Sequence, residues 1–201
     1  MLKTNELTPK VDEILVPHPE STYRVFVIKT EHGNIVVDAG VEEQAELLVQ
    51  AIKPYEPCCI VLTENHWDHV AGLPKILEAM PDLTVVAHEE EAYGVPVSVD
   101  RLLKDQEEIV IGVKALHAPG HSLGNIAILI EEEKTLIAGD AIFGKGDYAD
   151  SLSPPPEKYS RDVPQAIESI RYLLTHDFDK LILSHGVHEL KNAKEKVMQI
   201  I

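Results

Sequence analysis

The amino-acid sequence predicts an α/β (α+β) fold in which two β-sheets carry helices on their outer sides. Strand-like segments precede helix-like segments in both halves of the chain, which differs from the strict alternation of a βαβ chain. The chain has 201 residues, a length that fits one compact domain. No linker and no long internal repeat interrupts it, so we expect residues 1–201 to form a single domain.

The first 40 residues of the chain have strand patterns, and the helix patterns of the first half come after them. β-Branched and aromatic residues indicate the first strand, and apolar residues at helical spacing indicate the first helix, which Pro54 ends. The segment 92–106 has no clear pattern. In this half the sequence predicts strands at 22–30, 34–38, 58–63 and 84–87, and helices at 41–53 and 72–79.

The second half begins with closely spaced strand patterns and ends with helices. An unusually long loop separates the two parts, at residues 144–160, and it contains three consecutive prolines and two tyrosines. Loops of this length are often functional. In this half the sequence predicts strands at 108–111, 113–117, 125–131, 134–138 and 180–184, and helices at 162–174 and 189–201.

Acidic residues outnumber basic ones, with 34 Asp and Glu against 18 Lys and Arg and a formal net charge of −16. Proteins that bind nucleic acids or anionic membranes need a basic face, so we expect neither partner. No apolar run approaches the ~20 residues of a membrane-spanning helix, and the first residues lack a signal-peptide pattern. The sequence therefore predicts a cytoplasmic protein with a small-molecule substrate, and it is compatible with a homo-oligomer.

Cys58 and Cys59 are the only cysteines, too few for a disulfide framework. Because adjacent residues of a regular strand point to opposite faces, we expect two separate, small side chains that behave as hydrophobes.

Residues that can act as metal ligands are clustered directly after four predicted strands. The chain has ten histidines, and several stand next to acidic residues and to glycine or proline at these strand ends. Imidazole and carboxylate groups are the ligands that divalent transition metals prefer, and strand ends hold side chains rigidly. The four clusters are residues 64–69, 117–121, 139–140 and 184–186.

The first cluster, Glu-Asn-His-Trp-Asp-His at 64–69, resembles the His-x-His-x-Asp-His signature of metallo-β-lactamase-fold hydrolases. The resemblance continues, in the family's order and at similar separations, through Ala-Pro-Gly-His-Ser-Leu-Gly at 118–124, Gly-Asp at 139–140 and Ser-His-Gly at 184–186. Asp-Ala-Gly at 38–40 matches a further family motif. The resemblance implies the four-layer αββα sandwich, with metals at one edge of two paired mixed sheets.

The resemblance also implies a binuclear centre with a hydroxide between the metals as the nucleophile. Asp68 would be the catalytic group that orients this hydroxide and relays its proton. Adjacent Asp68 and His69 would diverge in a regular element, so we expect them on a loop. By this resemblance the first metal takes Glu64, His66 and His121, the second takes Asp68, His69 and His185, and Asp140 bridges the two.

Glu64 departs from the family pattern, which has histidine at this position. A third carboxylate makes the centre less positive, and oxygen ligands favour harder metals. We expect two divalent ions, with zinc first and manganese or iron as alternatives because of Glu64. Two alternatives stay open. In one, a single metal is held by the second ligand set, and in the other no catalytic metal is bound.

The implied activity is metal-dependent hydrolysis of a small ester, thioester or lactone. One alternative is a mononuclear iron oxidoreductase of the persulfide-dioxygenase type, and another is a non-catalytic ligand-binding member of the fold. Tyr148, His188 and Trp67 are candidates for substrate binding, although each could also serve only for packing.

Overall fold

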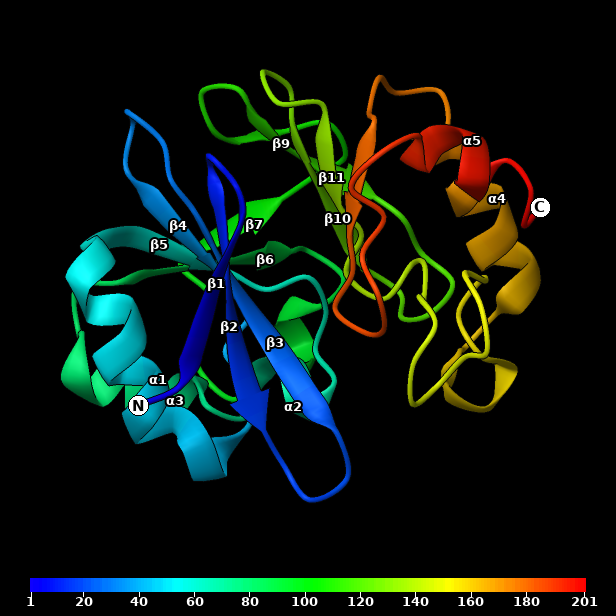
Figure 1. The fold of residues 1–201 in the computed structure, drawn as a ribbon. Coiled ribbons are helices and arrows are strands. Elements are labelled where there is room, and N and C mark those ends of the chain that lie inside the picture. Colours follow the sequence, from blue (N-terminus) through cyan, green and yellow to red (C-terminus); the bar gives the residue numbers. More distant parts are fainter. The chain divides into compact units, whose positions relative to one another are not determined.

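A computed structural model describes all 201 residues and contains two compact units, each built around one mixed β-sheet with its helices (Figure 1). The first unit comprises Met1–Ala87 and Ala92–Leu102, and the second comprises His88–Glu91 and Leu103–Ile201. Two mixed sheets with helices confirm the predicted fold class. Whether residues 1–201 act as a single domain stays a prediction.

The sheet of the first unit has seven strands in the order of the sequence. Strands β1 to β4 pair antiparallel, and β4, β5 and β6 pair parallel. The antiparallel strands are joined by short turns, whereas a helical crossover precedes β5, as parallel pairing requires. The strands are β1 (Lys3–Thr8), β2 (Val11–Pro17), β3 (Thr22–Ile28), β4 (Asn34–Val37), β5 (Pro57–Val61), β6 (Thr84–His88) and β7 (Arg101–Leu103).

The helices of the first unit pack their apolar stripe into the core beside the sheet. Helix α1 (Ala45–Ile52) buries Ala45, Leu48 and Ile52 and lies beside α3 (Leu73–Ala79) (Figure 1). Gly72 ends the turn before α3, and a Cβ there would lie 2.3 Å from the carbonyl oxygen of Ala39. Only glycine permits this close approach, which joins the segment after β4 to the segment after β5.

Two sequence-based boundaries in this unit were wrong. The single helix predicted at 41–53 is a 3₁₀ turn at Glu42–Gln44, then α1, then a second 3₁₀ turn at Lys53–Tyr55. The segment around Asp68 is also helical, forming the one-turn helix α2 (Trp67–Val70) rather than a loop.

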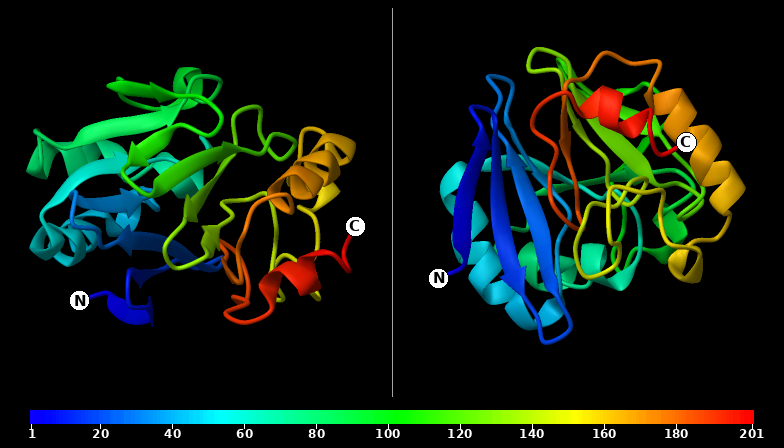
Figure 2. Two further views of the ribbon diagram at one scale, coloured as in Figure 1. Left: turned by 90° about the horizontal axis from the view of Figure 1, so that it is seen from above. Right: turned by 45° about the vertical axis from the view of Figure 1, so that its right-hand side comes forward.

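The sheet of the second unit has five strands in the order β12, β11, β10, β9, β8. Only β11 and β12 pair parallel, and the crossover between them contains the 144–160 loop and α4 (Val163–Leu173). Buried residues of α4 and of α5 (Ala193–Val197) share one apolar cluster with these strands, and Figure 2 shows both helices along this sheet. The strands are β8 (Glu108–Val110), β9 (Val113–His117), β10 (Ile126–Ile130), β11 (Thr135–Ile137) and β12 (Lys180–Ile182).

The predicted final helix at 189–201 was too long. Glu189 instead pairs with Leu181 of β12 in an isolated antiparallel bridge, so the chain turns back along the sheet before α5 begins. The 144–160 loop is tied by a similar bridge between Phe143 and Ser153. No helix in the structure is both long enough and apolar enough to cross a bilayer.

Leu73→Ala tests how far the first unit depends on its core. Leu73 is fully buried, so removing its side chain should lower the free energy of unfolding by roughly 2–5 kcal/mol in urea titration. The matched control is Leu47→Ala on α1, where 37% of the side chain is exposed and the change should stay within about 0.5 kcal/mol. Equal losses for both variants would contradict this description of the core.

Candidate metal centre

Four of the predicted ligands lie within six residues directly after β5. Glu64 and His66 lie on the connection that leaves the strand, and Asp68 and His69 lie on α2. Asp68 and His69 are adjacent on this one-turn helix, and Oδ2 of Asp68 lies 3.9 Å from Nε2 of His69. His69 is buried, whereas Asp68 and His66 are partly exposed.

A buried network behind His69 fixes the orientation of its ring. Asp38, which follows β4, accepts hydrogen bonds from the backbone N–H and the hydroxyl of Thr63. Its other oxygen lies 2.9 Å from Nδ1 of His69. With Nδ1–H donating to this carboxylate, a neutral imidazole keeps its lone pair on Nε2, the nitrogen left for a metal.

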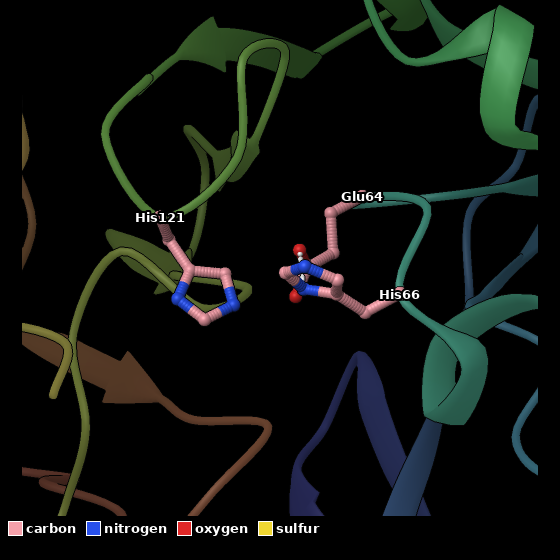
Figure 3. Close-up of side chains that lie close together, drawn as sticks. All are labelled: Glu64, His66 and His121. Atoms are coloured by element: carbon pink, nitrogen blue, oxygen red, sulfur yellow. Dashed lines mark ion pairs between the residues drawn. The ribbon is translucent and has the colours of Figure 1, made fainter. Parts of the chain in front are cut away.

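The carboxylate of Glu64 is fully buried between two imidazole rings. One oxygen lies 2.6 Å from Nδ1 of His66, and the other lies 3.3 Å from Nε2 of His69. Figure 3 shows the Glu64 carboxylate against the ring of His66, and it also draws His121 on its own loop after β9. A buried carboxylate is stable only beside positive charge or donors, so this half of the site is arranged for a cation.

In the second unit, the ring nitrogens of two histidines lie close to the same carboxylate oxygen of Asp140. Nε2 of His121 and Nε2 of His185 each lie 3.3 Å from Oδ2 of Asp140. All three side chains are at most 6% exposed. The three residues follow β9, β11 and β12, and the backbone N–H of Asp140 donates to the side-chain oxygen of Asn125.

The ring of His121 is oriented by Ser160 at the end of the 144–160 loop. The Ser160 hydroxyl donates to the carbonyl of Pro156 and lies 3.4 Å from Nδ1 of His121, so it accepts from that nitrogen. Nε2 of His121 then carries the lone pair that faces Asp140. Sequence analysis missed Ser160, because its partner is 39 residues away and no local motif connects them.

His117 at the end of β9 contacts the loop that carries His121 at a second place. Its Nε2 donates to the carbonyl of Leu123, and its ring stacks on that of His88 with centroids 3.9 Å apart. Burial and, secondly, the neighbouring His117 lower the pKa of His88. The stacked pair connects the end of β6 with the end of β9, next to the loop that carries His121.

The three predicted substrate-binding residues have different surroundings. The Tyr148 ring packs edge-on against His185 at 4.9 Å, on the 144–160 loop. Trp67 is 47% exposed, next to His66, and its ring contacts that of Tyr23. In His188, Nδ1 accepts from a backbone N–H of the β12 segment, which indicates a structural role for this nitrogen. Their contact with substrate stays a prediction.

The donor set fits a divalent transition metal. Imidazole nitrogens and carboxylate oxygens are the ligands of zinc, manganese and iron in proteins, and here hydrogen bonds hold two of the rings in the ligating tautomer. These His, Asp and Glu groups are consistent with a two-metal centre. All seven predicted ligands belong to groups that could hold an ion, namely Glu64, His66, Asp68, His69, His121, Asp140 and His185.

Comparison with known proteins shows that residues 21–185 match the family profile of the Metallo-beta-lactamase superfamily. An atrochrysone carboxyl ACP thioesterase of Claviceps purpurea (strain 20.1) is 31% identical over 72% of this chain and 49% of its own length. A hydroxyacylglutathione hydrolase of Hamiltonella defensa is 27% identical over 90% of this chain and 68% of its own length.

A solved structure, the DIM-1 metallo-beta-lactamase, superimposes with a TM-score of 0.82 at 16% identity, over 99% of this chain and 96% of that chain. Because only 16% of the residues are identical, the similarity to this structure shows a shared fold alone. The chain spans about half the length of the curated thioesterases it matches.

Asp38→Asn should weaken metal binding without changing any ligand. Asn tolerates the left-handed backbone at position 38, where φ is 66°, but it no longer offers a charged acceptor to His69. We expect zinc affinity to fall about 10- to 100-fold, measured by competition with a chromogenic chelator. The matched control is Asp100→Asn, which removes the charge of an exposed carboxylate that accepts from the backbone N–H of Val85. Unchanged affinity in Asp38→Asn would show that Asp38 does not position His69.

Proposed function

The chain belongs to the metallo-β-lactamase superfamily, and we propose that it is a metal-dependent hydrolase of a small thioester, ester or lactone. The observation that supports this most directly is the position of His69 between two buried carboxylates. Its Nδ1 lies 2.9 Å from Oδ2 of Asp38, and its Nε2 lies 3.3 Å from Oε1 of Glu64. A bound cation at this place would compensate the buried negative charge, and His69 would offer it Nε2 when Nδ1–H donates to Asp38.

Two divalent ions would be held by the residues that the resemblance assigned. Glu64, His66 and His121 would serve the first ion, and Asp68, His69 and His185 the second. Asp140 would serve both, which is supported by the approach of two histidine nitrogens to one of its oxygens. When bound, such ions supply Lewis acidity and activate water at neutral pH.

The side chains of this chain then have distinct tasks. Asp68 is partly exposed, with Oδ2 3.9 Å from Nε2 of His69, so its carboxylate can accept a proton from an attacking water and pass it on. Asp38 and Ser160 hold the rings of His69 and His121 in the tautomer that leaves Nε2 for a metal. The 144–160 loop contributes Tyr148 beside His185, where a phenol could contact a bound acyl group.

The substrate class is supported by the named activities of relatives. The curated relatives include an ACP thioesterase, whose name gives a thioester as its substrate, and a hydroxyacylglutathione hydrolase. A thioester is also one of the three substrate classes that the sequence predicted. The oxidoreductase and the non-catalytic alternatives remain predictions, and no contact in the structure favours either of them.

Metal removal should abolish hydrolysis, and restoring metal should recover it. We expect protein treated with a chelator to lose its activity toward a generic acyl thioester and to regain it with zinc or manganese. Asp140→Asn should lower kcat/KM at least about 100-fold, since it removes an oxygen shared by two histidines. The matched control, Asp150→Asn on the 144–160 loop, removes an exposed carboxylate and should leave the rate unchanged. Full activity after chelation would overturn the proposal, as would iron-dependent oxygen consumption in its place.

Glu64→His tests whether this carboxylate selects the metal. Imidazole in place of a carboxylate should raise the affinity for zinc relative to manganese, because nitrogen donors suit zinc and oxygen donors suit manganese. The measurement is a pair of competition titrations, one with each metal, on the variant and the parent chain. An unchanged ratio of the two affinities would show that Glu64 is not a ligand.

A further inference from the structure

The two cysteines form a second cluster of metal-binding groups, separate from the candidate metal centre. They lie near the start of β5, whereas Glu64 follows the end of that strand. The sulfur atoms of Cys58 and Cys59 are 3.9 Å apart. Cys58 is exposed and Cys59 is 6% exposed, so the pair can be reached from solvent through Cys58. Cys59 is buried, as expected for a small hydrophobe, but the expectation of a second buried side chain was wrong, because Cys58 is exposed.

A β-bulge brings the two sulfurs together. Asn34 pairs with Pro57, but Ile35 pairs with Cys59, so Cys58 is an extra residue in β5. Bulges interrupt the alternation of side chains that a regular strand imposes. The turn before β4 makes room for the exposed thiol, because a Cβ at Gly33 would lie 2.7 Å from the Cys58 sulfur.

The spacing of the sulfurs suits a bridging ion better than a disulfide. Consecutive Cα atoms are about 3.8 Å apart, which is shorter than the separation of about 4.4 Å or more that disulfides need. An ion bonded to both sulfurs at the zinc–sulfur length of about 2.3 Å would subtend an S–metal–S angle of about 116° across the 3.9 Å gap, and the longer bonds of a larger ion would narrow this angle toward the tetrahedral value. This angle lies between tetrahedral and trigonal values, so neither side chain has to move.

We propose that Cys58 and Cys59 form a chelating site for a soft, thiophilic cation, of the chemical class of Cd²⁺ or Cu⁺. Thiolates select such ions over the harder metals that carboxylates prefer. On binding, each thiol releases its proton to solvent and forms one sulfur–metal bond, so charge and atoms balance. Water or a small thiol completes the coordination on the exposed side of Cys58.

The surroundings of Cys59 keep its thiol protonated, so a cation that binds there has to displace the thiol proton. Burial and then the adjacent Cys58 raise the pKa of Cys59 to about 12, while the positive charge of Arg101 acts in the opposite direction. In the free protein Cys59 is therefore a protonated thiol. The exposed Cys58 makes the first bond to the ion, and Cys59 closes the chelate.

Titration with Cd²⁺ tests the site, because cadmium bound to thiolate gives an ultraviolet charge-transfer absorption that nitrogen and oxygen ligands do not give. We expect this absorption to saturate at one further ion per chain in protein whose other centre has first been loaded with zinc. Cys58→Ser and Cys59→Ser should each lower the cadmium affinity on the order of 100-fold or more, because the second bond is intramolecular. His66→Ala should leave the absorption unchanged, since this histidine belongs to the other centre.

Two outcomes would overturn the proposal. One is no charge-transfer absorption in the full chain at an excess of cadmium. The other is equal affinity in the full chain and in Cys58→Ser, which would indicate a single thiol rather than a chelate. Circular dichroism confirms that each variant is folded, and Cys58→Ser, which alters an exposed side chain, decides the result if the buried Cys59→Ser does not fold.

Discussion

The structure depends on the groups that compensate the charge of three buried carboxylates, each of which lies beside at least one histidine ring. Asp38 and Glu64 are fully buried in the first unit, and Asp140 is 3% exposed in the second. Moving a carboxylate away from water costs several kcal/mol unless donors or positive charge replace the water. Asp38 meets this cost with Thr63 and the N–H of His69. The other two face imidazole nitrogens, and a metal ion would compensate the charge of both.

Rigid strand ends make this arrangement possible. The segments that carry these side chains follow β4, β5, β9, β11 and β12, which are anchored in the two sheets and in their apolar cores. Ring orientation is then controlled by single hydrogen bonds, in which Nδ1–H of His69 donates to Asp38 and Nδ1–H of His121 donates to Ser160. The fold therefore places the histidine side chains. The polar contacts select the ring tautomer that leaves the Nε2 lone pair for a metal.

Local pattern was enough to predict two sheets with helices outside and the strand ends that carry the ligands, because strand periodicity and ligand motifs are both local signals. That the sheets are mixed was predicted only from the resemblance to a known family. The one-turn helix α2 escaped prediction, since four residues carry no periodicity. The contact of Ser160 with His121 and the bulge at Cys58 also escaped it. Both arise from pairing between distant segments, which a sequence pattern does not reveal.

The central claim is that the buried carboxylates and histidines hold two metal ions. The most direct measurement is the metal content per chain by plasma mass spectrometry, on protein purified without chelators or a metal-affinity column. The account predicts about two equivalents of zinc, manganese or iron, lost together when Asp140 is replaced by Asn. Protein that contains no metal and takes up none on addition of these ions would contradict it.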